Sequence, residues 1–462
     1  MSEIKLDISN MVNCIEDVKK AVLENDRGPE DPTNYSQLRG RLEASRNKLP
    51  PLYRENFFQP YVNKIDEIGE QGFNDILMSD PERQGQARLL LDIAQVILQN
   101  GEGYNWVATD AFEEVVSDLY DGFLSAEDRR GIRKPDNGAI PPLVKWGEPS
   151  SGAYTWPVDD AMSEGFNIKA AVVNLPPSDA RSSLLRWASL GHEVGGHDII
   201  HAYKGLRNQL SRAVQDALDK EDLGYDLSNY WSTRLDETTS DVLRILNMGP
   251  MSGIGVIGYF RALNYVYDGT LKLSNIGPAE DVHPAEILRG YLSASTVRLL
   301  SFKDANDWAN VIKADVDKDL SAIELEGNTV DKNNAIKSAE IVASTIFSTK
   351  FDSLDKHAFS EIQNWHDYDQ AIVQKIIPSL NAMNPLSRDI PLEGIYAAHV
   401  VAASIQSALS KNADVHFIFN RMLSILKRMH DKNPSWGPLF MRHPGNVSRE
   451  FFSYRGQIEM RG

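Results

Sequence analysis

Residues 190–201 read LGHEVGGHDIIH, and this stretch holds three of the ten histidines of the 462-residue chain. His192 and His197 are five residues apart, with Glu193 after the first and Gly195-Gly196 before the second. On a regular α-helix five residues turn through about 500°, which would point the two imidazoles apart. One π-helical turn absorbs the extra residue, and glycine lowers the steric cost of irregular backbone. The stretch therefore predicts a bulged helix that presents two histidines to one metal ion.

A second motif, RLDETTSD at residues 234–241, begins 37 residues after His197. A glutamate on a separate helix, here Glu237, can complete a two-histidine, one-glutamate zinc site. Asp241 lies one helical turn further on, where it can accept a hydrogen bond from a ligand histidine and fix its tautomer. We therefore predict His192, His197 and Glu237 as zinc ligands and Asp241 as their outer partner.

Two further residues are predicted to take part in catalysis. Glu193 is not a ligand in this interpretation but the general base, which takes a proton from water and passes it to the leaving amine. His283 is the candidate donor for a developing oxyanion. Its alternative is a surface histidine before a proline at a helix start. Rivals for the oxyanion role are Tyr203, Tyr225, Tyr230 and Tyr259.

Other interpretations of the histidines remain open. A rival metal site would use His197, His201 and a carboxylate, but it leaves His192 and Glu193 unexplained. A site without metal would bury two histidines and a glutamate together, which is costly. His399 lies in an apolar stretch and is predicted to be a core histidine.

Together, the His-Glu-x-x-Gly-His and Glu-x-x-x-Asp motifs resemble those of the gluzincin zinc metallopeptidases. The five-residue spacing with a glycine before the second histidine resembles the dipeptidyl peptidase III family. The resemblance covers roughly residues 152–251. It implies a zincin-like core that hydrolyses peptides, with zinc on His192, His197 and Glu237 and with Glu193 as base.

The remaining pattern predicts a predominantly α fold with a small β-sheet (α+β). Residues 169–175 form a short apolar run before Pro176-Pro177, which favours a strand at a sheet edge. The resemblance places the substrate-binding edge strand of the family at this same run. A helix is predicted from Ser178-Asp179 into His192, and another from near Ser232 through Glu237.

We expect three regions: an N-terminal helical region (1–130), a zinc-binding catalytic core with the edge strand (131–275), and a C-terminal helical region (276–462). Helical spacing of apolar residues is clearest in the two outer regions. The zincin-like core would thus be flanked by helices on both sides.

The amino-acid composition limits the classes of binding partner and substrate that we expect. The formal net charge of −17 disfavours nucleic acid and anionic membranes, and leaves a peptide or small amide as substrate. The single cysteine, Cys14, permits no internal disulfide and no cysteine zinc cage. With neither a signal peptide nor an apolar run of about 18 residues, we expect a cytoplasmic protein.

The sequence therefore predicts an enzyme, a zinc metallopeptidase. Two alternatives remain. The same ligands serve a zinc hydrolase of a non-peptide amide or ester. A non-catalytic helical binding protein with a structural zinc would use a closed site with four protein ligands.

Overall fold

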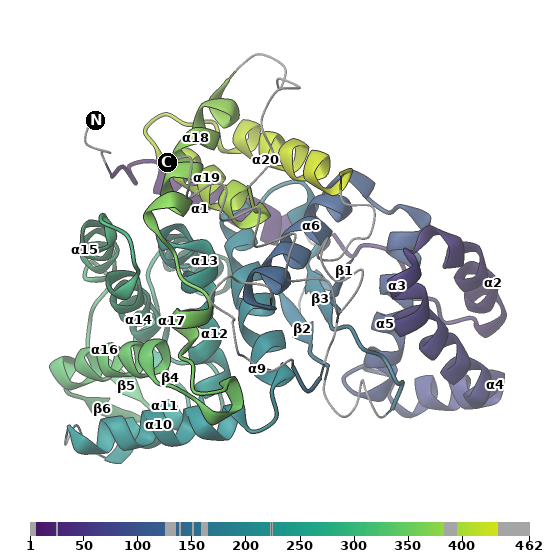
Figure 1. Ribbon diagram of the computed structural model, residues 1–462, viewed down its shortest axis with the longest axis horizontal. Helices are drawn as coiled ribbons and strands as arrows, with labels where there is room; N and C mark the ends of the chain where they lie inside the picture. The colour runs from purple at the N-terminus through teal and green to yellow at the C-terminus, as the bar shows by residue number, and fades with distance from the viewer. Residues whose placement is uncertain are drawn as a thin grey trace.

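A computed structural model describes residues 6–24, 26–124, 135–137, 140–149, 152–158, 165–221, 223, 225–382 and 395–432. These residues form a mostly helical molecule with two small sheets (Figure 1). The predicted α-rich α+β class is confirmed at this level. The boundary expected after residue 130 lies outside the described residues, and the division into three regions stays a prediction.

Four N-terminal helices, α2 (Tyr35–Ser45), α3 (Pro51–Tyr53), α4 (Gln59–Ser79) and α5 (Gln86–Glu102), form a layer that projects to the right in Figure 1. They pack through their own hydrophobic cluster, which also takes in Val172 of the sheet. A π-helical turn, η2 (Arg54–Phe58), links two of them. The two other N-terminal helices, α1 (Met11–Glu24) and α6 (Trp106–Leu124), pack into the central core instead.

A three-stranded sheet stands between this layer and the central helices. Its strands are β1 (Leu143–Trp146), β2 (Tyr154–Trp156) and β3 (Val172–Leu175). Their order is β1-β3-β2, with β3 parallel to β1 and antiparallel to β2. The prediction that run 169–175 is an edge strand was therefore wrong, because its paired residues lie in the centre. Pro176-Pro177 follow the last paired residue, so they remove no hydrogen bond from the ladder.

The two edges of this sheet differ. On the β1 side, side chains of α5 bind the strand backbone in place of another strand. Trp146 N–H donates to Gln99 Oε1, and Gln99 Nε2 donates to the Trp146 carbonyl, both at 2.8 Å. Asn100 Nδ2 donates to the Val144 carbonyl at 2.9 Å. This edge is thus closed to further strands.

The segment before the candidate site is not the single helix predicted from Ser178-Asp179 to His192. Two 3₁₀ turns, η5 (Pro177–Ala180) and η6 (Leu184–Ser189), precede the short helix α8 (Leu190–His192). Ser183 between them has φ +68°, and an α-helix cannot continue through a left-handed residue.

A π-helical turn, η7 (Glu193–Asp198), follows and runs into α9 (Ile199–Ala202). The next helices are α10 (Leu206–Lys220), α11 (Tyr225–Thr233), α12 (Leu235–Met248) and α13 (Pro250–Asp268). The helix that carries Glu237 thus begins at Leu235, three residues later than predicted. It ends where predicted, at Gly249 with φ +66°.

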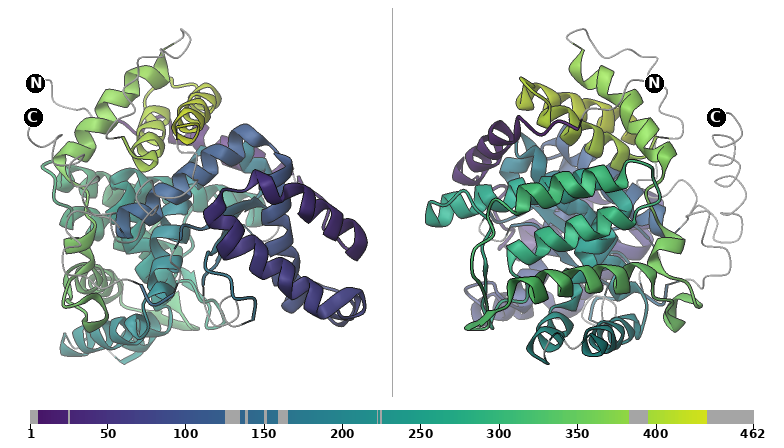
Figure 2. Two further views of the ribbon diagram at one scale, coloured as in Figure 1. Left: turned by 45° about the vertical axis from the view of Figure 1, so that its right-hand side comes forward. Right: turned by 90° about the vertical axis from the view of Figure 1, so that its left-hand side faces the viewer.

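The C-terminal part is helical apart from a second sheet of order β4-β5-β6. Helices α14, α15 and α16 lie side by side (Figure 2). The elements are β4 (Ile276–Gly277), α14 (Glu286–Leu299), α15 (Ala305–Val316), β5 (Ile323–Leu325), β6 (Asn328–Val330), α16 (Lys332–Ser348), α17 (Phe359–Ile362), α18 (Asp367–Asn381), α19 (Ala397–Leu409) and α20 (Val415–His430).

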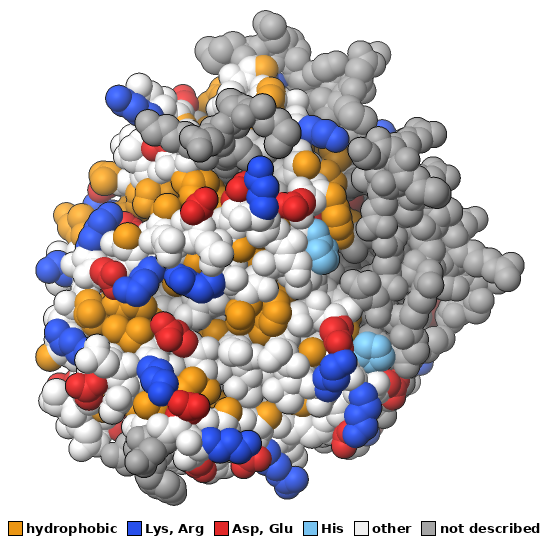
Figure 3. Space-filling view, turned by 60° about the vertical axis from the view of Figure 1, so that its left-hand side comes forward, with side chains coloured by type: hydrophobic (Ala, Val, Ile, Leu, Met, Phe, Trp, Pro, Cys, Tyr) orange, Lys and Arg blue, Asp and Glu red, His pale blue; other side chains and the backbone are white. Residues whose placement is uncertain are grey.

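One large hydrophobic cluster joins residues from Met11 to Met429, so the first and last helices share the central core. On the face shown in Figure 3, acidic and basic side chains are interspersed among the described residues. None of the described helices combines the length and apolar character needed to cross a bilayer.

Candidate metal centre

The π turn predicted from the histidine spacing is present. η7 spans Glu193–Asp198, directly after His192 at the end of α8. Hydrogen bonds of the i→i+5 type place residues five apart one turn above each other. The imidazole rings of His192 and His197 consequently lie with their centroids 4.8 Å apart.

The two glycines of η7 have a packing role. Neither has a positive φ, so backbone freedom alone does not require them. A Cβ on Gly196 would lie 2.4 Å from Ser240 Cβ, and one on Gly195 would lie 2.7 Å from Asn247 Nδ2. Both contacts are with α12. The glycines therefore let the histidine-bearing turn pack directly on the helix that carries Glu237.

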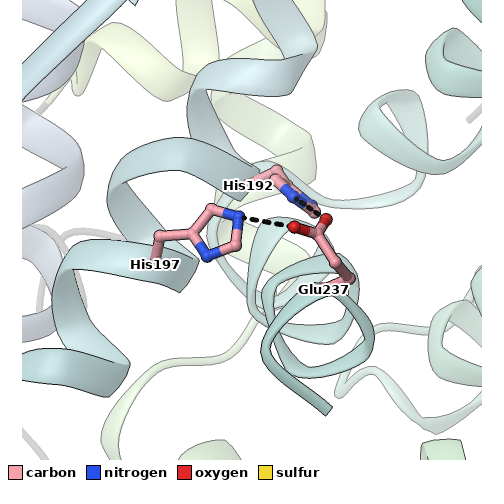
Figure 4. A group of neighbouring side chains, drawn as sticks. All are labelled: His192, His197 and Glu237. Carbon is pink, nitrogen blue, oxygen red and sulfur yellow. Dashed lines mark hydrogen bonds and ion pairs between the residues drawn. The ribbon is translucent and has the colours of Figure 1, made fainter. Parts of the chain in front are cut away.

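The three predicted ligands converge (Figure 4). The Glu237 carboxylate lies 3.0 Å from His192 Nε2 and 3.3 Å from His197 Nε2, and one ligand atom from each residue fits within 4.8 Å of the others. Zinc–ligand bonds of 2.0–2.1 Å at tetrahedral angles separate donors by roughly 3.3 Å. The observed spacing thus suits a zinc-sized ion. The side chains of His192, His197 and Glu237 are 8%, 18% and 11% exposed.

Asp241 takes the position predicted for it. His192 Nδ1–H donates to Asp241 Oδ1 at 2.9 Å, which leaves Nε2 directed at Glu237. Arg289 holds the same carboxylate with two hydrogen bonds, from Nε at 2.6 Å and from Nη2 at 2.9 Å. The outer partner of the histidine is itself fixed in place, which is typical of metal sites.

The electrostatics of the centre favour a cation. Burial alone would lower the pKa of His192, but the hydrogen bonds with Asp241 and Glu237 raise it to about 9. Burial opposes ionisation of Glu237, yet its bonds to both histidines hold its pKa well below the usual range. For Asp241, Arg289 and Arg244 overcome the effect of burial and lower the pKa. The negative potential that retains a proton on His192 would also attract a divalent metal.

Glu193 lies at the start of η7 beside the predicted ligand His192, and is 6% exposed. It is not one of the three converging residues. Its carboxylate accepts a hydrogen bond from the hydroxyl of Thr155 on β2, at 2.9 Å. The predicted base is therefore next to the ligands but not among them.

His283 lies beside Glu237, the third predicted ligand. Its Nε2 is 3.2 Å from Glu237 Oε2, and its Nδ1 is 2.9 Å from Asp281 Oδ1. The imidazole is 48% exposed. The structure thus brings the predicted oxyanion donor to the open side of the centre.

The rival residues have other surroundings. His201 Nε2 lies 3.6 Å from Asp236 Oδ2 and does not join the ligand cluster among the described residues. The Tyr230 hydroxyl accepts the Ala285 N–H at 2.7 Å. Tyr203 is buried in the core, and Tyr259 lies against a guanidinium, that of Arg186. The Tyr225 side chain lies outside the described residues.

His399 is a buried core histidine, as predicted. Its Nε2 lies 2.8 Å from Asp369 Oδ1, and its Nδ1 accepts the Tyr396 N–H at 3.0 Å. Both ring nitrogens are thus engaged within the helical core.

Sequence reasoning missed Thr155 and Arg289. Thr155 had a usable signal, since Tyr154-Thr-Trp156 is a run of strong strand formers between Gly152 and Pro157. Arg289 had none, because only the packing of α14 on α12 brings it to Asp241.

Comparisons with protein-family models, curated proteins and solved structures find no match to this chain. Function is therefore inferred from the chemistry of the site itself.

Proposed function

We propose that this protein is a zinc-dependent peptidase with a zincin-like centre. The observation that carries the proposal is the π turn, which places His192 and His197 on one face opposite Glu237. π turns are rare and recur at functional sites. Two imidazoles and a carboxylate of separate elements, with their ligand atoms within 4.8 Å, form the donor set of a catalytic zinc site.

The residues around these ligands supply the remaining chemistry. When bound, zinc would act as a Lewis acid and lower the pKa of a coordinated water from 15.7 toward about 7. Glu193 accepts the proton of the attacking water and returns it to the leaving amine. His283, with Nδ1 held 2.9 Å from Asp281 Oδ1, presents Nε2 at the centre, 3.2 Å from Glu237 Oε2, where its N–H would donate to the developing oxyanion.

Among the described residues no strand pairs with the outer edge of β2, and this edge favours a peptide over other amides. The carbonyls of Ala171, just before β3, and of Leu175 at its end accept N–H groups from the β1 chain. Val172 and Asn174 alternate with these residues and pair with Trp156 and Tyr154. By alternation, the N–H and C=O of Thr155 point away from the sheet. An extended peptide can pair with this edge beside Glu193.

Metal content and cleavage of a peptide library test the proposal together. We expect about one zinc per chain in the wild type and in Glu193→Gln, and much less in His197→Ala. His201→Ala is the matched control, because this neighbouring histidine lies outside the ligand set, and it should keep its zinc. Glu193→Gln should lose about 10²–10⁴-fold in turnover.

Three outcomes would contradict the proposal. Full zinc in His197→Ala would exclude this ligand set. Full zinc without cleavage of any peptide, amide or ester would favour a structural zinc. Turnover of non-peptide amides or esters alone would favour the other hydrolase class.

A further inference from the structure

Thr155 makes a contact that nothing in its own strand requires. Its Oγ1 lies 2.9 Å from Glu193 Oε2 and 3.2 Å from the Glu193 main-chain carbonyl. A hydroxyl has a single proton to donate. The carboxylate is closer and carries the charge, so it takes the stronger hydrogen bond.

The strand that carries Thr155 is fixed from its other face. Side chains alternate along a strand, so Tyr154 and Trp156 point away from Glu193. The Tyr154 hydroxyl and Trp156 Nε1 both donate to Asp92 Oδ2 at 2.7 Å. Lys145 Nζ lies 2.6 Å from the other oxygen of that carboxylate, and this pair is buried. β2 is thereby tied to α5 on both sides of Thr155.

We propose that Thr155 is the positioning residue for Glu193. Its hydroxyl holds Oε2, so the carboxylate keeps one orientation and exchanges protons through Oε1, to which no described residue donates. This inference rests on the proposed function, in which Glu193 is the base. It adds a link between substrate and base, because the outward N–H and C=O of Thr155 are the groups that an extended peptide would pair with.

A binding experiment tests this without a known substrate. Co²⁺ replaces zinc as a visible probe, and acetohydroxamate is the ligand, since a hydroxamic acid passes its proton to a nearby carboxylate when it chelates a metal. Dissociation constants are measured for the wild type, Thr155→Val, Thr155→Ser and Glu193→Gln. Thr329→Val, at an edge strand of the other sheet, is the matched control.

We expect equal Co²⁺ uptake in all six proteins, the sixth being the double variant with Thr155→Val and Glu193→Gln. Thr155→Val should weaken acetohydroxamate binding roughly 10- to 100-fold, the effect of losing a hydrogen bond to a charged group. Thr155→Ser should restore most of the affinity, and Thr329→Val should leave it unchanged. In the Glu193→Gln background, Thr155→Val should have little further effect, because the two residues act through one contact.

The contrary outcomes distinguish failure of the Thr155 inference from failure of the proposed function. If Thr155→Val binds acetohydroxamate like the wild type, or weakens binding equally in the Glu193→Gln background, this inference is wrong while the metal centre stands. Loss of Co²⁺ uptake in Thr155→Val would likewise reduce Thr155 to a structural residue. If the wild type takes up no Co²⁺, the proposed function fails, and this inference fails with it.

Discussion

The described part of the chain contains two π turns, and they serve different ends. Each brings residues five apart onto one face. In η2 these are Tyr53 and Phe58, which are at most 1% exposed in the core of the N-terminal layer. In η7 they are His192 and His197, which converge on a carboxylate. A π turn is therefore not a functional signature by itself, and the side chains that it pairs decide its use.

The two turns also have different causes. Pro60 follows η2, and a proline ring crowds the carbonyl four residues earlier, here that of Asn56. Widening the helix before Pro60 relieves that contact. η7 has no proline, and its backbone is held instead by the close packing of Gly195 and Gly196 on α12. One turn follows from a local residue and the other from a tertiary contact.

The largest contrast is expected from removing one side chain of each pair. Phe58→Ala should lower the free energy of unfolding by about 3–5 kcal/mol, because it empties a core position, and should leave zinc content unchanged. His197→Ala should lose most zinc but change the unfolding of the chelator-treated protein far less. Denaturant titration and elemental analysis check both. A large loss of apo stability in His197→Ala would mean that η7 also serves mainly for packing.

A glycine substitution tests the packing of η7. Gly196→Ala places a methyl group against Ser240, so we expect about 1–3 kcal/mol of destabilisation and weaker zinc binding. Gly40→Ala in α2 is the control, since nothing lies within 4 Å of its added Cβ. That change should stabilise by about 0.5–1 kcal/mol. Thermal unfolding compares them, and equal effects would show that contact with α12 does not explain the glycine.

The two π turns also differ in what lies next to them. Asp241 accepts a hydrogen bond from His192 beside η7, whereas no such carboxylate partner serves η2 among the described residues. Asp241→Asn should weaken zinc binding about 10- to 100-fold, since the amide no longer holds His192 Nδ1–H as a carboxylate does. Asp236→Asn, one residue before Glu237, should have little effect. Competition with a chelator at fixed pH measures both affinities. Equal affinity for the two variants would assign Asp241 to structure alone.

The smallest effect is expected from deleting Gly195. Four residues on an α-helix and five on a π turn both cover about one turn, so the flanking helices keep their phase. The variant should retain zinc within about tenfold, with His192 and His197 now at the regular four-residue spacing. Insertion of alanine at the same place should abolish binding. If the deletion variant binds no metal, the π turn is itself required.

The sequence predicted the features of the site that depend on spacing. The five-residue separation of His192 and His197 indicated the π turn, and the one-turn separation of Glu237 and Asp241 indicated the outer hydrogen bond. The function inferred from these residues stays a proposal. Local patterns were enough here because the geometry of a helix is nearly the same in every protein.

Features set by tertiary contacts were predicted less well. Run 169–175 looked like an edge strand because of the prolines after it, whereas the edge is β2, a three-residue strand in a loop-rich segment. The turn at η2, although its cause in Pro60 is local, was not predicted either, since aromatic residues pack at many spacings. The left-handed Ser183, which interrupts the expected helix, had no local signal, and the N–H of the next residue, Leu184, donates to Asp17 of α1.

The sealed β1 edge limits how this sheet can assemble. The side chains of Gln99 and Asn100 already bind the backbone carbonyls on that side. The sheet can therefore add a strand at one edge only, among the strands described. A strand that binds at β2 occupies the only open place among the described strands of this sheet. If two copies paired through their β2 edges, the assembly would end at a dimer, because neither copy would offer a second edge. Growth into a fibre through this sheet is therefore blocked by two amide side chains.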